Sequence, residues 1–436
     1  MKILFFPSDL GGGFGHISRC LAIAHEAKNK GHKCAFVIND KKYEKRLKDN
    51  FIIFVSKKHY RWLSTLRLLK NNIFGKKSHI VPLFTEISGL DYQVLRDGFI
   101  NDAITRYMLN QYVEIVKSYK PDVLVGDTNL LVWMTSQKVK VPVVQIVRLA
   151  SHPQTAKLIW WKDKPEDLIA PKTSFLFNPL LSEMGLEPIN RAEDLLQGDF
   201  YIVPSIPEIE PIPEDGKTAY VGDLTISTRN MENPSWLKEI DDNLPLVYIT
   251  IGGGAGPVGN NLFFSTIIKA FVDKPINVIV STSNKFNPSD FPNTSQNIRF
   301  YKWVPGKLMI SRADLVIFHG GYSTMMETVT CGKPTIITPF HTEQEGNGRR
   351  LEMLGCGRVI KLSSEDYKKI EGQWRYGTYS FLVQNRFDLT PDKLYREVDN
   401  LLTNNEYLTN AKGLQSKVRK YHGVQKAVEL IEKYLA

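Results

Sequence analysis

Apolar residues along the chain gather in short blocks, and stretches with helical spacing separate these blocks. Residues 2–7, 34–38 and 52–55 are apolar runs of strand length. Between the first two runs, residues 16–30 repeat apolar side chains at helical spacing and stop at Gly31, which predicts a helix. Strands that alternate with helices form a parallel sheet covered on both faces. This part of the chain is therefore expected to be an α/β domain.

The alternation continues toward the end of the chain, with one break. Further strands are expected at 122–126, 142–147, 246–251, 277–281, 298–301, 315–318 and 335–338, and further helices at 91–119, 130–138, 261–272, 306–312, 323–331 and 343–354. Residues 361–390 lack the pattern and are interpreted as an insertion or irregular loop, after which Thr390 and Pro391 begin the closing helices. The chain is thus predicted to hold two doubly wound domains, over 1–222 and 223–410, with closing helices over 411–436.

The composition excludes several classes of protein. The 436 residues are 42% hydrophobic and 23% charged, which is typical of a folded, water-soluble chain with more than one domain. No run of 18 apolar residues occurs, and the first apolar block is too short for a signal peptide. The four cysteines lie far apart without a C-x-x-C pair, so neither a disulfide framework nor a zinc site is expected. We expect a cytoplasmic protein.

Positive charge is concentrated near the start of the chain. Residues 41–77 hold 12 basic and 2 acidic residues, whereas the net charge of the whole chain is +10. Lysines attract anionic headgroups while aromatic rings such as Trp62 and Phe74 enter the interface. We therefore predict that 41–77 contacts an anionic membrane surface, with Trp160 and Trp161 as a second contact. The alternative is a solvated face whose aromatic residues belong to the core. Nucleic acid is not expected as a partner, because no binding motif accompanies the charge.

Glycine-rich loops follow the first strand of each predicted domain, at 11–15 and 252–254. Neither loop completes the dinucleotide fingerprint G-x-G-x-x-G, because His16 and Pro257 occupy its last position, and no P-loop motif occurs. A glycine loop before a helix still brings backbone N–H groups close to a phosphate. Gly13 and Gly15 are therefore candidates for an acceptor or phosphate loop, or they serve only the tight turn.

A denser group of candidate binding residues follows the predicted strand 315–318. It consists of His319, Gly320, Gly321, Ser323, Thr324 and Glu327. The hydroxyl and N–H groups lie at the positive end of a predicted helix, which suits a pyrophosphate. The glutamate lies one turn further on, where it can accept hydrogen bonds from a ribose diol.

Two flanking segments extend this group. Upstream, Trp303-Val304-Pro305 offers a flat ring for a nucleotide base. Downstream, Glu343 and Gln344 end a strand and can hydrogen-bond sugar hydroxyls. Each element alone is explained by helix capping or core packing. Together, in this order and spacing, they indicate a nucleotide-sugar site.

These residues resemble the donor-binding signature of the family 1 glycosyltransferases, which use UDP-sugars. The patterns W-x-P, H-G-G-x-[GS]-[ST]-x-x-E and P-x-x-x-[DE]-Q-x-x-N are matched at every defining position between Trp303 and Asn347. The resemblance covers the whole chain. It implies the GT-B fold, in which two Rossmann-like domains, acceptor domain first and donor domain second, face each other across a cleft.

The resemblance also implies roles for single residues. Trp303 would stack on uracil, Val304 would bind it through its backbone, and Glu327 would hold the ribose. The pyrophosphate would be bound by His319, Ser323 and Thr324 beside Gly320 and Gly321, the sugar by Glu343 and Gln344, and Gly253 would lie in a loop over the phosphates.

His16 is the predicted catalytic base. The family carries a histidine after the first strand, often in G-H-x-x-P, whereas this chain has Arg19 in place of the proline. This departure resembles the lipid-modifying branches of the superfamily. Asp127 follows the strand 122–126, where family members place the acid that orients the histidine. A histidine can deprotonate an attacking hydroxyl, and an aspartate can fix its tautomer. If Asp127 only orients the ring, its loss should cost less turnover than loss of His16; helix capping is the alternative for both residues.

The chain has no D-x-D pair, the common pyrophosphate-chelating motif of metal-dependent glycosyltransferases. We therefore expect metal-independent transfer, with no metal ligand and no resident cofactor, since the UDP-sugar is a co-substrate. The predicted activity is inverting transfer of a hexose from a UDP-sugar to the hydroxyl of a hydrophobic or lipid-linked acceptor; inversion is implied by the resemblance. Alternatives are transfer to a soluble small-molecule aglycone, a sugar-nucleotide 2-epimerase of the same fold, and a non-catalytic binding subunit.

Overall fold

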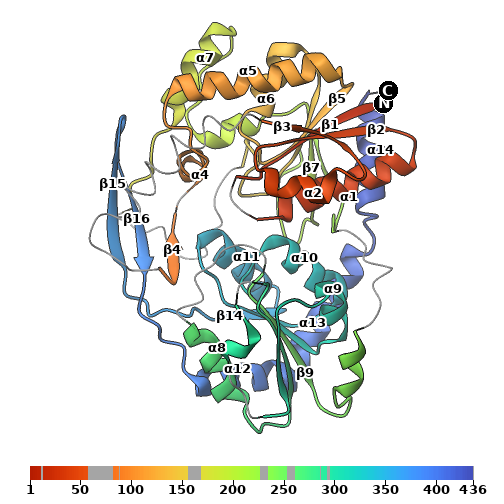
Figure 1. Ribbon diagram of the computed structural model, residues 1–436, viewed down its shortest axis with the longest axis vertical. Coiled ribbons are helices and arrows are strands. Elements are labelled where there is room, and N and C mark those ends of the chain that lie inside the picture. Colours follow the sequence, from red (N-terminus) through yellow and green to blue (C-terminus); the bar gives the residue numbers. More distant parts are fainter. Residues whose placement is uncertain are drawn as a thin grey trace.

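The computed structural model describes residues 1–10, 13–56, 82–87, 89–155, 168–225, 234–252, 261–284, 286–291 and 295–435. Two lobes, each built on a parallel sheet, are stacked along the long axis of the molecule, and a small third sheet lies along one side (Figure 1). The predicted α/β class with two doubly wound sheets is confirmed.

The first lobe contains a seven-stranded sheet in which every neighbouring pair is parallel. Its order is β3 (Ile52–Val55), β2 (Lys33–Ile38), β1 (Lys2–Pro7), β5 (Val123–Asp127), β6 (Val143–Ile146), β7 (Phe200–Val203) and β8 (Thr218–Tyr220). Alternate residues of β1 enter different cores. One core includes α5 (Asp102–Tyr119), α6 (Val132–Val139) and α7 (Asn178–Glu183), and the other includes α1 (Gly15–Asn29).

The second lobe contains a six-stranded parallel sheet. Its order is β11 (Ile298–Tyr301), β10 (Asn277–Ser281), β9 (Leu246–Thr250), β12 (Leu315–Phe318), β13 (Thr335–Ile337) and β14 (Gly357–Val359). One core includes α8 (Leu262–Phe271) and α12 (Pro391–Thr403); the other includes α9 (Gly306–Arg312), α10 (Tyr322–Cys331), α11 (Thr342–Met353) and α13 (Asn405–Val418).

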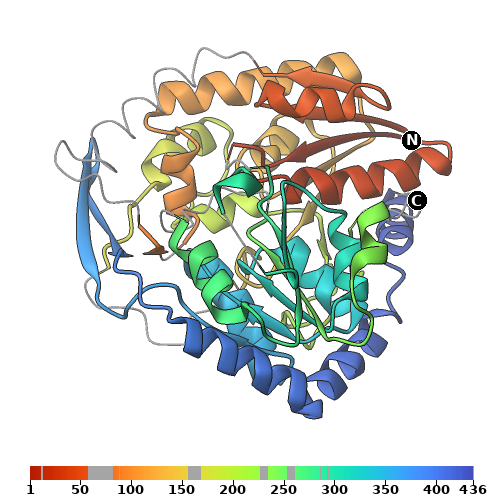
Figure 2. The same ribbon diagram turned by 60° about the horizontal axis from the view of Figure 1, so that its bottom comes forward.

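The last helix, α14 (Val424–Leu435), returns to the first lobe. Ala427, Val428 and Ile431 are fully buried in the same core as α1. The two chain ends consequently lie close together (Figures 1 and 2). The closing helices are therefore divided between the lobes, with α13 on the second and α14 on the first.

The region 361–390 is not an irregular loop. It forms a hairpin of β15 (Lys368–Trp374) and β16 (Gly377–Gln384), and β16 also pairs with β4 (Phe84–Glu86) of the first lobe. This hairpin is the blue pair of strands at the edge of Figure 1. The sequence pattern missed it because β15 is largely exposed and carries polar residues instead of an apolar block. The hairpin thus ties the two lobes together through backbone hydrogen bonds.

Local capping explains where two predicted helices begin. The stretch 91–119 is broken into α4 (Asp91–Arg96) and α5, because Gly98 takes a positive φ of 90° and Asn101 then caps α5 by accepting from Ile104 N at 2.9 Å. Thr390 caps α12 as predicted, accepting from Lys393 N at 3.2 Å. A further short helix is α2 (Glu44–Leu47).

Candidate active site

The carboxyl ends of β1 and β5 bring the predicted base and its acid together. Asp127 is the last residue of β5 and pairs with Pro7 of β1, while α1 begins one residue before His16. His16 Nδ1 lies 2.7 Å from Asp127 Oδ1. The aspartate side chain is 1% exposed and the histidine side chain 35% exposed. The acid is therefore buried behind a histidine whose ring reaches the surface of the site.

Arg19 completes this pair as a third member. Its Nε donates to Asp127 Oδ2 at 2.9 Å and its Nη2 to Oδ1 at 2.9 Å, and Nη2 lies 2.9 Å from His16 Nδ1. Burial raises the pKa of Asp127, but Arg19 and then His16 outweigh it and lower this pKa to about 2. An ionised carboxylate only accepts, so the bond from His16 requires the proton on Nδ1 and leaves Nε2 as the free base.

The loop before α1 approaches the second lobe. A Cβ atom at Gly15 would lie 3.1 Å from Ser323 Oγ, so glycine allows the starts of α1 and α10 to meet. A Cβ atom at Gly13 would meet nothing within 4 Å, and its carbonyl accepts from the Tyr43 hydroxyl at 3.1 Å. Gly11 and Gly12 lie outside the described residues. The candidate base and the candidate pyrophosphate helix thus share one location.

The His319 ring is packed against two glycine backbones. A Cβ atom at Gly252 would lie 2.1 Å from His319 Cε1, and one at Gly321 would lie 2.4 Å from its Nε2. Gly320 has a φ of +86°, and a Cβ there would lie 2.6 Å from the Gln344 carbonyl oxygen. The glycines of both loops are therefore required to accommodate the histidine, whether or not they also approach a phosphate.

The start of α10 is suited to an anion. Its N-cap residue, Gly321, provides no side-chain cap, and Ser323 and Thr324 lie half-buried in the first turn. The N–H groups of a first turn have no partner within the helix and bind anions well. Glu327 lies half-buried one turn further along, and burial, helped by Asp223, raises its pKa to about 7.

Trp303 and Val304 have opposite environments. Trp303 lies two residues after the end of β11 and is 54% exposed, whereas Val304 is 2% exposed in the core of the second lobe. A buried valine that anchors an exposed indole leaves the ring available for stacking. Gly253 lies outside the described residues.

Glu343 and Gln344 differ in the partners of their side-chain hydrogen bonds. Gln344 is 9% exposed, and its Oε1 accepts from Phe340 N at 2.9 Å, so its oxygen stabilises the strand end. Glu343 Oε1 accepts from Arg148 Nη1 at 2.6 Å and from Asn347 Nδ2 at 3.1 Å. Asn347 also donates to the Gly320 carbonyl at 2.8 Å, which connects the two donor motifs.

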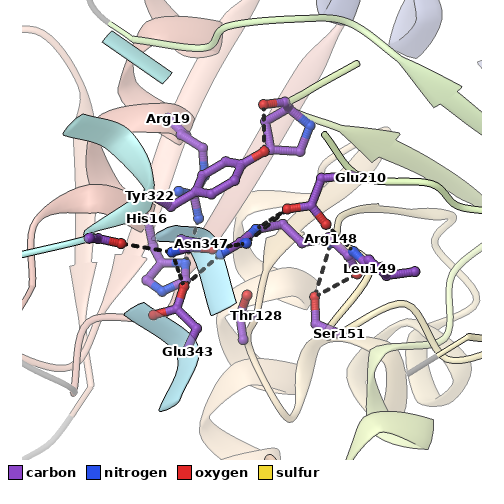
Figure 3. A network of polar contacts seen from close by, with 12 residues as sticks. His16, Arg19, Thr128, Arg148, Leu149, Ser151, Glu210, Tyr322, Glu343 and Asn347 are labelled. Carbon is purple, nitrogen blue, oxygen red and sulfur yellow. Dashed lines mark hydrogen bonds and ion pairs between the residues drawn. The ribbon is translucent and has the colours of Figure 1, made fainter. Parts of the chain in front are cut away.

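The sequence analysis missed Arg148, Glu210 and Tyr322, which Figure 3 shows at the centre of this network. The Arg148 guanidinium carbon lies 3.6 Å from the centroid of the Tyr322 ring. The position of Arg148 in the sequence could have identified it as a candidate, because Arg148 closely follows the buried strand β6 just as Asp127 ends β5. No such indication pointed to Tyr322, since an aromatic residue at a helix start ordinarily belongs to the core.

Part of the basic segment 41–77 can be assessed, because 41–56 is described. Tyr43 and Phe51 are 5% and 7% exposed and belong to the core beside α1. In this part, the aromatic residues are therefore core residues and the lysines form a solvated face. Trp62, Leu66, Leu69, Phe74, Trp160 and Trp161 lie outside the described residues. Across the described ranges, no helix combines the length and the apolar character needed to cross a membrane.

The two parallel Rossmann-like sheets give this chain the GT-B fold, as expected. Residues 269–375 match the family model described as glycosyltransferase family 28 C-terminal domain. Among solved structures, CalG4, the calicheamicin glycosyltransferase, is similar with a TM-score of 0.72 and 17% identity, covering 100% of this chain and 98% of that one. Such a likeness shows the fold.

Two relatives are similar in sequence. A PGL/p-HBAD biosynthesis glycosyltransferase of Mycobacterium tuberculosis is 24% identical over 285 residues, which cover 60% of this chain and 64% of the relative's length. The NDP-glycosyltransferase YjiC of Bacillus subtilis is 24% identical over 336 residues, covering 75% of this chain and 76% of that protein. The fold, the family model and these relatives all point to the glycosyltransferases.

Proposed function

We propose that this protein is an inverting, metal-independent glycosyltransferase that moves a hexose from a UDP-sugar to the hydroxyl of a hydrophobic or lipid-linked acceptor. One observation carries the proposal: His16, which is hydrogen-bonded to Asp127 at the end of β5, is the second residue of α1, and the first residue of that helix, Gly15, abuts Ser323 at the start of α10. A general base of the first lobe and an anion site of the second therefore meet where acceptor and donor must react.

The chemistry is a single displacement. The acceptor oxygen attacks the anomeric carbon while its proton moves to His16 Nε2, and the bond from the anomeric carbon to the phosphate oxygen breaks. UDP leaves with the electron pair, and its charge is met by the N–H groups of α10. Asp127 stabilises the imidazolium that forms. One displacement inverts the anomeric configuration.

We propose metal independence because the chain has no D-x-D pair, the common pyrophosphate-chelating motif of metal-dependent glycosyltransferases. The positive end of α10 supplies charge stabilisation for the leaving group instead. No resident cofactor is proposed.

A matrix of UDP-sugars against lipid, polyprenyl-phosphate and phenolic acceptors, with products identified by mass spectrometry, tests the proposal. His16→Ala should lower transfer by about 10²–10⁴-fold and leave UDP binding unchanged, because the base acts on the acceptor. Transfer that proceeds only with soluble phenols would favour the small-molecule alternative. Epimer formation without any acceptor would favour the epimerase, and a His16→Ala variant with most of its kcat would contradict the assigned base.

A further inference from the structure

Arg148 lies between the two lobes and belongs to the first. It follows β6, and its side chain is 13% exposed. Its Nε and Nη2 donate to Glu210 Oε1 at 2.9 and 2.8 Å, while Nη1 donates to Glu343 Oε1 and Nη2 to Asn347 Oδ1, each at 2.6 Å (Figure 3). The guanidinium thus joins a buried carboxylate of the first lobe to two residues of α11 in the second.

Aromatic and backbone contacts fix the guanidinium further. Arg148 stacks on Tyr322 at 3.6 Å, and the Tyr322 hydroxyl donates to the Pro204 carbonyl at 3.1 Å. Glu210 is 1% exposed, and its Oε2 accepts from Leu149 N at 2.8 Å. Arg148 therefore has a single well-defined position when the lobes are together.

Arg148 is poorly suited to bind a phosphate itself. Four of its five N–H groups are engaged by the bonds to Glu210, Glu343 and Asn347, and two carboxylates surround its one positive charge. Its effect falls on Glu343. Burial raises the pKa of Glu343, but Arg148 and then His341 lower it to about 2, so this carboxylate stays ionised at any working pH.

Glu343 keeps one oxygen available. Both of its hydrogen bonds go to Oε1, whereas no residue in the described ranges donates to Oε2, and the side chain is 35% exposed. An ionised oxygen held in one orientation accepts hydrogen bonds from hydroxyl groups. The carboxylate is thus presented by contacts that originate in both lobes.

We propose that Arg148 is a positioning residue that holds Glu343 for the donor sugar, so that recognition of the sugar, but not of the nucleotide, depends on docking of the first lobe onto α11. The inference rests on the proposed function. It goes further by assigning part of donor-sugar recognition to a residue of the acceptor lobe, whose guanidinium does not touch the sugar.

Calorimetry with UDP and with a UDP-hexose separates the two parts of the donor. Arg148→Gln should leave the Kd for UDP within about twofold and weaken UDP-hexose binding by about tenfold or more, the range for losing charge-assisted hydrogen bonds. Arg148→Lys should recover part of this loss, because lysine keeps the positive charge but lacks the planar guanidinium with its several N–H donors. Since Arg148 acts through Glu343, the double variant Arg148→Gln/Glu343→Gln should bind UDP-hexose no more weakly than Glu343→Gln alone.

Arg350→Gln is the matched control. Arg350 lies on α11, the same helix as Glu343, and contacts the first lobe by donating through Nε to the Glu208 carbonyl at 3.0 Å. Its loss should not change the ratio of UDP-hexose to UDP affinity. If Arg148→Gln fails to fold because Glu210 is left unpaired, Arg148→Gln/Glu210→Gln replaces it.

The outcomes distinguish the two proposals. Equal UDP-hexose affinity in wild type and Arg148→Gln, or additive losses in the double variant, would overturn the positioning role while nucleotide binding remains intact. Absence of any binding of UDP or a UDP-hexose to the wild type would instead overturn the proposed function itself.

Discussion

Replacing Asp127 by asparagine should harm catalysis about as severely as losing His16, contrary to the milder effect expected for a purely orienting acid. Asparagine removes the negative charge but leaves Arg19 in place, 7% exposed and with Nη2 2.9 Å from His16 Nδ1. In the transition state the histidine becomes an imidazolium, and an unneutralised guanidinium then opposes it.

The size of this effect follows from Coulomb's law. For charge centres about 4 Å apart, the repulsion is about 1 kcal/mol at the dielectric constant of water and about 4 kcal/mol at an effective value of about 20. The side chain of His16 is 35% exposed, so the true value lies between these limits. This corresponds to about 5- to 10³-fold in kcat, and the loss of tautomer control adds to it. We expect a total loss of about 10²–10⁴-fold.

A double variant isolates the electrostatic part. Arg19→Gln in the Asp127→Asn background removes the unpaired cation and should recover at least about fivefold in kcat. Asp215→Asn is the control, because Asp215 Oδ2 faces His152 Nε2 at 3.6 Å in the same lobe but belongs to a different histidine pair. Initial rates with saturating donor and acceptor are the readout. Near-wild-type activity of Asp127→Asn, or a double variant slower than Asp127→Asn, would refute the reasoning.

Four further predictions concern the donor site, the metal and the membrane. Trp303→Ala should weaken UDP binding by about 1–3 kcal/mol in calorimetry, and unchanged affinity would place the base elsewhere. Since the pKa of Glu327 is raised to about 7, its carboxylate loses charge below that pH. Affinity for a UDP-hexose, which lacks the terminal phosphate of UDP that titrates near pH 6, should fall between pH 8 and 6 in wild type but stay flat in Glu327→Gln. Transfer should survive EDTA, and loss that Mg²⁺ or Mn²⁺ restores would contradict this. Co-sedimentation with anionic liposomes should fall with salt and when Lys57, Lys58, Arg61 and Arg67 are changed to glutamate; equal recovery with neutral liposomes would remove the case for a membrane surface.

The elements that the sequence pattern predicts well are the buried strands of the two parallel sheets. Apolar blocks such as 2–7 and 315–318 are strands because both faces of a parallel sheet are buried, and glycine loops mark the following turns. The hairpin of β15 and β16 lies outside this rule. Its strand β16 pairs with β4, about three hundred residues earlier in the chain, and the exposed side chains of β15 follow no apolar period.

The contacts of the site residues also differ in how far the sequence predicts them. The proximity of His16 and Asp127 could be predicted, because Asp127 ends β5, His16 begins the helix that follows β1, and neighbouring parallel strands bring such ends together. The partners of Arg148 could not, because Glu343 and Asn347 belong to the other lobe and their contact depends on how the lobes dock. A sequence shows which residue types end each strand, but not which strand ends of two separate sheets will meet.

Tyr322 shows what that docking achieves. Its ring lies 3.6 Å from the guanidinium carbon of Arg148 and 5.9 Å from that of Arg19. One arginine holds the acid of the proposed catalytic pair, and the other holds the carboxylate proposed to face the donor sugar. The ring belongs to the second lobe, whereas both arginines belong to the first. Both arginines therefore depend on one aromatic ring of the second lobe, so the docking of the lobes supports the proposed base and the proposed donor-sugar carboxylate together.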